Sequence, residues 1–559
     1  MNLMVKSLFY GTQNFCFTVK LNHRTKGNQK RMNKWLNKTN LIIGLALLIF
    51  TGILIKTSWI CDDAYITFRT IENFINGYGL VFNIGERVQT YTHPLWFFLI
   101  SGIQFVALKI FGLSYWNQLF CIAAGVSILL SVFSISIFGF GIVKHAKTAF
   151  FAVTTLIFSK AFMDFSTSGL ENPLTHLLLV IFLFIFIKSD EGSSVRLLKL
   201  SFIAGMATLN RLDTILFYLP PLLFELLNQS KKVKAIGTII IGFLPLIIWE
   251  IFSLFYYGFL FPNTAYAKLN TGISKFDLFA QGVNYYLNSI RIDPITLVVI
   301  ISAILLPFFQ KKKRQLPIAT GIFFYLIYIL YIGGDFMSGR YFAAPFLVAV
   351  VMLSVYIPIR NRIFASGYVI LLIFSLLLPT SPVRSPINYT QGLEFRSFLD
   401  KNKIVDERGV YYERMGLLKD DREGSYPGSK FSGNNWRLKE KPIELILVGP
   451  LGIHAYQVGP NFHVIDKNGL ADPLIARLPV ENINQWRIGH FRHIIPDGYI
   501  ETLSSGENVI DDKNLATYYD RLSLIIHGRL FDWNRIITIW NINRGKYNFL
   551  IERYWENLR

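Results

Sequence analysis

Long apolar runs separated by short polar segments recur through the first two thirds of this chain. A helix needs about 20 apolar residues to cross the hydrocarbon of a bilayer. The runs that approach this length are 41–59, 119–143, 149–165, 173–187, 198–210, 212–227, 236–257, 295–309, 317–332, 341–357 and 364–378. The pattern therefore predicts an α-helical polytopic membrane protein with about 11 transmembrane helices.

Basic residues collect in alternate loops between these runs, and this alternation predicts the orientation of the chain. The basic loops hold Lys144 and Lys147, then Lys188, Arg196 and Lys199, then Lys231, Lys232 and Lys234, then Lys311, Lys312, Lys313 and Arg314, then Arg360 and Arg362. Cytoplasmic loops are enriched in Lys and Arg, so we expect a cytoplasmic N-terminus. The assignment requires that the apolar run 95–111 does not cross, and we expect it to lie as a helix in the outer interface.

Three regions follow from this topology. Residues 1–38 form a basic cytoplasmic N-terminal extension, and residues 39–380 form a transmembrane core with a large first outer loop at 60–117. Residues 381–559 are less apolar, with a strand-like run at 443–448 and turn signals at Asn434-Asn435 and Asn468-Gly469. We expect this tail to be a mixed α/β extracytoplasmic domain of a multi-pass plasma (inner) membrane protein.

Composition agrees with a membrane protein and argues against two other classes. Of the 559 residues, 52% are hydrophobic and 16% are charged. The formal net charge of +20 does not indicate a nucleic-acid partner, because the basic residues of the apolar two thirds lie in short loops. The three cysteines show no zinc-site or disulfide spacing. No His or Cys cluster supports a metal site, and a divalent cation bound by carboxylates alone stays an open alternative.

The most informative feature is the pair Asp62-Asp63, directly after the first apolar run. Adjacent carboxylates repel each other and lose hydration near lipid, so they persist where a cation, a proton or a substrate hydroxyl compensates them. A catalytic role is the main interpretation, and a helix cap with a surface partner is the alternative. Glu171, in a later outer loop, is either a second acid or a cap ahead of Pro173.

Cations and aromatic residues occupy the same predicted face of the membrane. The candidate donor-binding residues are Arg69, Tyr65, His93, Arg211, Lys268 and Arg340. Arg69 lies about two helical turns beyond Asp62, so it suits a salt bridge as well as a phosphate. Carboxylates beside cations at a membrane surface suit the transfer of a sugar from a lipid phosphate to a hydroxyl group, because the acid activates the hydroxyl while the cations neutralise the leaving phosphate.

Several segments carry a resemblance to a known family. They are Asp62-Asp63-Ala64-Tyr65-Ile66, Gly79-Leu80-Val81-Phe82-Asn83, Gly85-Glu86-Arg87-Val88, Gly333-Gly334-Asp335-Phe336, Gly469-Leu470-Ala471-Asp472-Pro473-Leu474 and Gly489-His490-Phe491-Arg492. Together they resemble GT-C polyprenyl-phosphate-sugar glycosyltransferases, and more narrowly the terminal β-(1→2)-arabinofuranosyltransferases of bacterial cell-wall arabinan. The resemblance covers most of the chain, from about residue 41 to residue 499. The chain departs from the family at His93, where Asn is expected after Tyr91-Thr92.

The resemblance implies a GT-C membrane core, a polyprenyl-phosphate-linked pentofuranose donor and an envelope glycan acceptor on the outer side of the bilayer. It also implies that Asp62 faces the reacting centre while Asp63 orients the substrate, a metal or the loop backbone. Three alternatives remain: a transporter or flippase of lipid-linked sugars, a GT-C enzyme that modifies protein or lipid A, and a structural membrane scaffold. The sequence leaves the sugar, the linkage and the stereochemistry open.

Overall fold

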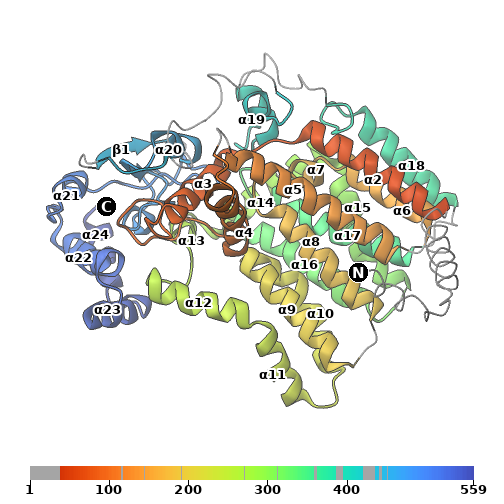
Figure 1. Ribbon diagram of the computed structural model, residues 1–559, viewed down its shortest axis with the longest axis horizontal. Helices are drawn as coiled ribbons and strands as arrows, with labels where there is room; N and C mark the ends of the chain where they lie inside the picture. The colour runs from red at the N-terminus through yellow and green to blue at the C-terminus, as the bar shows by residue number, and fades with distance from the viewer. Residues whose placement is uncertain are drawn as a thin grey trace, which may run out of the picture.

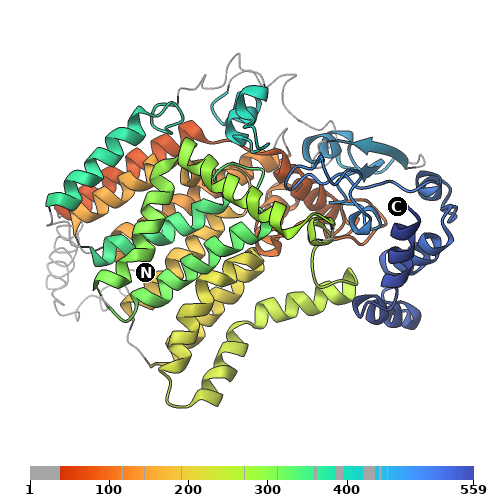
Figure 2. The ribbon, with the colours of Figure 1, turned by 180° about the vertical axis from the view of Figure 1, so that it is seen from behind.

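The computed structural model describes residues 38–114, 118–143, 145–189, 192–269, 271–310, 312–357, 362–385, 395–419, 435–439, 443–449 and 451–558. The basic N-terminal extension before residue 38 lies outside the described residues. The same holds for Asn434 and for the predicted inner-loop residues Lys144, Lys311 and Arg360. The chain divides visually into a large helical bundle and a region of shorter elements that includes the C-terminus (Figures 1 and 2).

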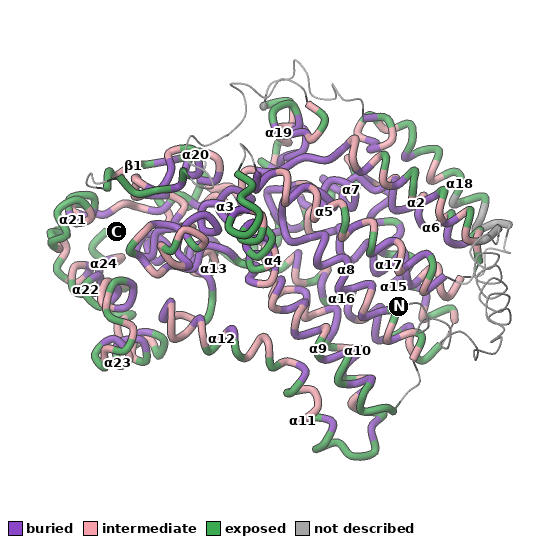
Figure 3. The backbone as a smooth tube through the Cα atoms, in the orientation of Figure 1, coloured by how far each residue is buried: buried purple, intermediate pink, exposed green. Residues whose placement is uncertain are grey.

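The bundle is made of apolar helices that pack around one large hydrophobic core. Its main helices are α2 (Lys38–Thr57), α5 (Gln118–Ser136), α6 (Ala146–Phe158), α8 (Asn172–Lys188), α9 (Ser194–Asn210), α10 (Ile215–Leu227), α15 (Pro294–Gln310), α16 (Gln315–Ile332), α17 (Ala343–Tyr356) and α18 (Arg362–Leu377). Figure 3 shows burial concentrated in the middle of the bundle. The outer faces remain apolar, with Leu48 71% and Leu129 70% exposed. An apolar exterior on a helical bundle is the mark of a membrane protein.

Length and apolarity identify fewer spanning helices than the sequence pattern predicted. Within the described residues, three helices satisfy both conditions, namely Asn40–Thr57, Gln118–Ile142 and Gln315–Ile332. Two bent pairs raise the number to five: α11 (Lys232–Gly242) with α12 (Leu244–Tyr256) at 56°, and α14 (Lys275–Ile292) with α15 at 113°. The run 95–111 forms α4 (Pro94–Phe105) and the π-helical turn η1 (Val106–Ile110). The count of about 11 crossings and the interfacial position of α4 stay predictions.

The C-terminal third combines a small sheet with short helices. Strands β1 (Glu444–Val448) and β2 (Phe462–Asp466) pair in parallel, joined through α20 (Gly452–Val458). The predicted strand-like run 443–448 thus forms a strand. The helices here are α19 (Glu407–Met415), α21 (Tyr499–Ser505), α22 (Lys513–His527), α23 (Trp533–Asn543) and α24 (Asn548–Asn557).

The first loop and the C-terminal third share a core. Helix α3 (Asp62–Ile75) contributes Ile66 to a buried cluster with Val448, Leu451 and Val464 of the C-terminal third. The buried Arg69 joins the two segments: its guanidinium donates to the carbonyl of Phe82 and to those of Ala455, Gly459 and Phe462. The C-terminal third is therefore packed onto the start of the chain, and this contact places it beside Asp62 and Asp63.

Candidate active site

Ends of several bundle helices bring their polar residues to one place. His93 precedes α4, Glu171 precedes α8, and Arg340 lies in the 3-10 turn η4 (Arg340–Phe342) before α17. Arg211 follows α9, and Asp335 follows α16. Helix starts and helix ends therefore meet here, so the loops that carry these five residues lie on one side of the bundle. The polar loops that the sequence suggested do converge.

Glu171 is the centre of this charged cluster. Its Oε1 accepts a hydrogen bond from Arg211 Nη1 at 2.8 Å and lies 3.3 Å from Arg340 Nη2. Its Oε2 lies 3.4 Å from His93 Nδ1. Burial raises the pKa of Glu171, but Arg340, His93 and Arg211 outweigh it and hold that pKa at about 2. Glu171 is therefore an ionised anchor for two arginines, and it is unsuited to donate a proton.

The two arginines are held in different ways. Arg211 makes a two-bond contact with Asp213, at 2.7 Å from Nε and 2.9 Å from Nη2, and its guanidinium lies 4.7 Å above the Tyr341 ring. Arg340 lies 3.6 Å from Asp335, and its Nε is buried without a hydrogen-bond partner among the described residues. Arg340 thus retains an unused donor, whereas the guanidinium of Arg211 is more fully paired.

His93 is neutral in this setting. Its Nε2 lies 2.9 Å from Thr67 Oγ1, and its Nδ1 faces Glu171. Burial, with Arg340 and Arg211 nearby, lowers the pKa of His93 to about 4 even though Glu171 favours its protonation. An uncharged imidazole between Thr67 and Glu171 positions the loop, and it adds no positive charge for a phosphate.

Asp62 and Asp63 have separate environments. Asp62 accepts hydrogen bonds from the backbone N–H groups of Gly452 at 3.0 Å and Ile453 at 2.8 Å, so it caps the start of α20. Asp63 is half-buried and accepts no hydrogen bond from any described residue. Both carboxylate oxygens of Asp62 are thus occupied by backbone amides, and the expected order, in which Asp62 leads, stays a prediction.

Groups around Asp63 shift its pKa in opposite directions. Burial raises the pKa of Asp63 to about 6, with contributions from Asp62 and Asp335, while Arg340 and Lys268 act in the opposite direction. A carboxylate with a pKa just below neutrality is mostly ionised at pH 7 and still able to take a proton, which suits a general base. Of the three acids predicted from the sequence, Asp63 has the environment that best suits this role.

Lys268 stands at the accessible edge of the cluster. Its side chain is exposed and forms no ion pair with any residue that the structure describes. The surrounding protein desolvates the ammonium group and lowers the pKa of Lys268, while Asp335 and Asp63 raise it. An ammonium group that has no ion-pair partner among the described residues, and that lies within the electrostatic reach of these two acids, is available for an anionic ligand.

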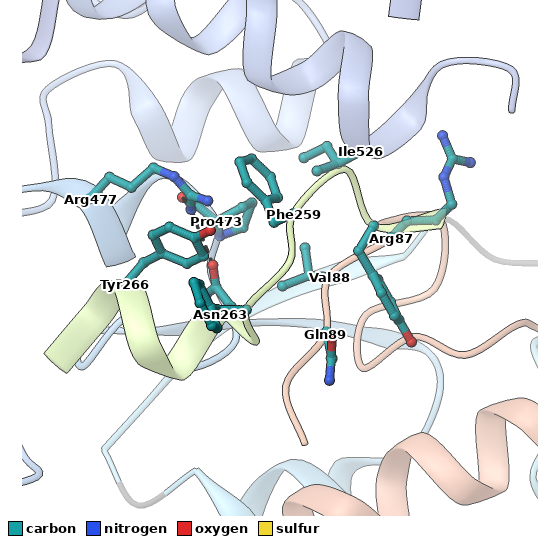
Figure 4. A pocket seen from close by; sticks show the side chains of 11 residues that line it. Arg87, Val88, Gln89, Phe259, Asn263, Tyr266, Pro473, Arg477 and Ile526 are labelled. Atoms are coloured by element: carbon teal, nitrogen blue, oxygen red, sulfur yellow. Dashed lines mark hydrogen bonds between the residues drawn. The ribbon is translucent and has the colours of Figure 1, made fainter. Parts of the chain in front are cut away.

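The position of Lys268 depends on a second contact with the C-terminal third. Lys268 lies on α13 (Asn263–Leu269), whose Asn263 donates to the carbonyls of Gly469 at 2.8 Å and Asp472 at 3.0 Å. Arg477 lies against the same helix, 4.4 Å above the Tyr266 ring, in the pocket of Figure 4. The segment 469–474, which marked the family resemblance, therefore holds α13 in place.

Two residues of the C-terminal third extend the site, and the sequence reasoning missed both. Glu407, the first residue of α19, is buried, and its carboxylate has no partner among the described residues. Burial, together with the nearby Asp63, raises the pKa of Glu407 well above its usual value. Arg487 lies 5.2 Å from the Phe336 ring and counters that effect. No local motif marks either residue. The end of α19 bonds to Ser58 and Ile60, just before α3, and Arg487 donates to the carbonyl of Lys403, so long-range contacts bring both residues in.

A buried ionic network fixes α19 and hence Glu407. Lys160, on the short helix α7 (Lys160–Asp164), pairs with Asp164 and lies 2.8 Å from Asp406. Arg408 pairs with Asp164 at 2.7 Å. Asp406 also caps α19 by accepting from the Gly409 N–H at 3.1 Å. Residues 406 and 408 are thus tied to the bundle on both sides of Glu407.

Two predicted donor-binding residues lie outside this arrangement. The guanidinium of Arg69 is taken up by four backbone carbonyls, so it forms no salt bridge with Asp62 and takes no part in the donor site proposed below. Tyr65 packs edge-on against Tyr456 at 5.3 Å, and its hydroxyl is buried without a partner in the described part of the chain.

A mostly apolar pocket opens at Leu212, the residue that follows Arg211. It lies between the first loop, the end of α9 and α12, and it is lined by Gln89, Thr92, Pro94, Thr208, Leu209, Leu212, Leu246, Trp249, Glu250, Leu260 and Pro262. Within the described residues, no group of three His, Cys, Asp or Glu side chains is arranged to hold a metal ion. The cluster therefore offers arginine and lysine for a negative charge, beside an apolar surface.

Comparison with known proteins agrees with this chemistry. The chain matches the model of the Alg9-like mannosyltransferase family over residues 39–334, more than half of its length. It is 24% identical over 556 residues to a terminal beta-(1->2)-arabinofuranosyltransferase of Mycobacterium tuberculosis, with 84% of this chain and 86% of that protein covered. A protein of the same description from Corynebacterium glutamicum is 26% identical over 405 residues, covering 64% of this chain and 55% of that protein.

The family match, the apolar bundle and the convergence of acids and cations at its helix ends agree with one another. The chain belongs to the Alg9-like mannosyltransferase family and is a membrane glycosyltransferase of the GT-C type.

Proposed function

We propose that this enzyme transfers a sugar, arabinofuranose or a related pentose, from a polyprenyl-phosphate donor to an envelope glycan on the outer side of the plasma membrane. The observation that carries the proposal is Asp63, which accepts no hydrogen bond from the described residues. Burial raises its pKa to about 6, against the opposing effect of Arg340 and Lys268. The two related arabinofuranosyltransferases support the choice of sugar.

In this mechanism Asp63 takes the proton of the acceptor hydroxyl as that oxygen attacks the sugar carbon. The bond from that carbon to the phosphate oxygen breaks, and Lys268 and Arg340 neutralise the phosphate that leaves. Glu171 holds Arg340 and Arg211 in place. The leucines and Trp249 around the pocket at Leu212 suit contact with the start of the prenyl chain. Asp62 supports the site through α20.

A strain comparison tests this function. A deletion strain is complemented with the wild-type gene, with Asp63→Asn or with Asp62→Asn, and its lipids and surface glycans are analysed. The Asp63→Asn strain should accumulate one polyprenyl-phosphate sugar and lose one terminal glycan residue, because transfer stops while donor synthesis continues. An unchanged glycan in that strain would overturn the assignment of Asp63.

Two alternatives are separated by a purified system. In detergent micelles there are no two compartments, so a transporter or flippase produces no new glycosidic bond, whereas a transferase does. Offering a protein, lipid A or an envelope glycan as acceptor then distinguishes the acceptor classes. Transfer to the glycan alone is the expected outcome.

A further inference from the structure

Helix α23 presents apolar residues to the outside on one face. Trp533 is 71% exposed, Ile537 41% and Trp540 64%, and Phe531, just before the helix, is 85% exposed. Positions 533, 537 and 540 are spaced by four and three residues, so they share one side of the helix. We call Phe531, Trp533, Ile537 and Trp540 the α23 patch. Folding leaves these large side chains uncovered, which marks an interaction surface.

The opposite face of α23 is committed to the C-terminal third. Ile539 and Ile542 are buried in the core that includes Leu522 and Ile525 of α22. Asp532 caps the helix by accepting from the Asn534 N–H at 2.7 Å. The helix is therefore held in one orientation, and the α23 patch is its outward side.

Helix α23 begins where a candidate membrane span ends. Arg535 donates to the carbonyls of Phe255 at 2.9 Å and Tyr256 at 2.8 Å, which are the last residues of α12. The Phe531 ring lies 5.3 Å from the Phe255 ring. Helices α11 and α12 pass the tests for a spanning segment as a bent pair. Figures 1 and 2 both show α12 leading from the bundle toward α23.

The apolar surface is continuous from α12 to the α23 patch. On α12, Ile248 is 58% exposed and Ile251 is 64% exposed, as expected for a helix that faces lipid. The α23 patch extends this apolar surface and contains two tryptophans, and tryptophan prefers the boundary between lipid and water. Arg544 lies 5.4 Å from the Trp540 ring, and an arginine here suits anionic headgroups.

We propose that α23 lies in the outer interface of the bilayer and inserts the α23 patch among the lipid headgroups and upper acyl chains. The partner is the lipid surface, because the patch extends a lipid-facing helix and pairs tryptophan with arginine. Insertion of the α23 patch holds the C-terminal third at the membrane surface beside α12. It thereby keeps that part of the chain, which supplies Arg487 and Glu407 to the active site, at the level of a lipid-linked substrate.

Spin-label accessibility tests the proposal on the full-length protein. Cys16→Ser and Cys121→Ser remove two native thiols, and Cys61 is fully buried and stays. Trp533→Cys and Trp540→Cys are labelled singly, and Ile500→Cys, 40% exposed on α21 away from α12, is the matched control. The protein is placed in vesicles of phosphatidylethanolamine and phosphatidylglycerol, and collisions with oxygen and with a water-soluble nickel chelate are measured.

We expect labels at 533 and 540 to collide often with oxygen and rarely with the nickel chelate. The label at 500 should collide often with the nickel chelate. Nickel access at 533 and 540 equal to that at 500 would overturn the proposal. Protection from both reagents would also overturn it, since a protein surface and not lipid would then cover the patch. If Trp533→Cys does not fold, Ile537→Cys reports on the same face.

Discussion

Replacing Asp63 by Asn should stop sugar transfer without unfolding the protein. Asp63 is half-buried and has no hydrogen-bond partner among the described residues, so the amide disturbs no native contact. A positioned general base contributes about 10²- to 10⁴-fold to a rate. The loss expected for Asp63→Asn is therefore of that size, or about 2.7–5.4 kcal/mol of activation free energy.

The pH dependence gives an independent magnitude. With a pKa of about 6, Asp63 is raised above its usual value of 3.8, mainly by burial. The ionised fraction is about ten elevenths at pH 7 and about one eleventh at pH 5, so kcat/KM of the wild type should fall roughly tenfold between these values. Above pH 7 the rate should be level with respect to this group. In Asp63→Asn the acid limb near pH 6 should disappear.

The assay uses purified protein in lipid nanodiscs, a polyprenyl-phosphate pentofuranose and a synthetic glycan acceptor. Initial rates are measured from about pH 4 to about pH 8, roughly two pH units on either side of the pKa of Asp63. Asp62→Asn is the matched control. Its amide still accepts from Ile453 N–H but faces Gly452 N–H with a donor, so it should lose about 1–3 kcal/mol of stability while the acid limb stays. If Asp63→Asn keeps more than about a tenth of the rate, or retains the limb, Asp63 is not the base.

Further predictions concern the cation and the contacts that build the site. Lys268→Met should move the acid limb to higher pH, because a charge that lowers the pKa of Asp63 is lost, and it should raise KM for the donor, because a cation for the phosphate is lost. Lys275→Met, at another exposed lysine on the next helix, should change neither in the same rate assay. Arg69→Gln should lower the thermal unfolding midpoint and expose the C-terminal third to limited proteolysis, since a glutamine cannot serve four carbonyls and each one left unpaired costs about 1–3 kcal/mol; an unchanged midpoint would contradict the anchoring role. Asp406→Asn should destabilise the protein by about 3–5 kcal/mol by leaving Lys160 under-compensated, and a chemical denaturation series compared with the wild type measures it.

Stability should also depend on His93 in acid. The pKa of His93 falls from 6.5 to about 4 on folding, mainly through burial, so the unfolded chain binds a proton that the native protein does not bind between these values. His93 therefore lowers the free energy of unfolding as the pH falls from about 6.5 to 4. His93→Gln should show a shallower loss over that window in thermal unfolding, and an identical slope would refute it.

The sequence alone determined the class of this protein and the neighbourhood of its site. Apolar runs must be buried in a bilayer or a core, so their repetition indicated a membrane protein without tertiary information. Acids and cations next to those runs lie at helix ends, and Glu171, Arg211 and Arg340 do meet there. The motif residues also gave the glycosyltransferase family, which the family comparison bears out.

Only the tertiary structure separated the two aspartates, since neighbours in sequence point in different directions from a helix. Asp62 accepts hydrogen bonds from the amides of Gly452 and Ile453, which are 390 and 391 residues away, and so becomes a cap. Asp63 accepts none from the part of the chain that the structure describes. The same long-range packing brought in Glu407 and turned Arg69 into an anchor. Local sequence fixes which groups are present and on which helix they lie; the pKa and the role of each group depend on what the distant chain places beside it.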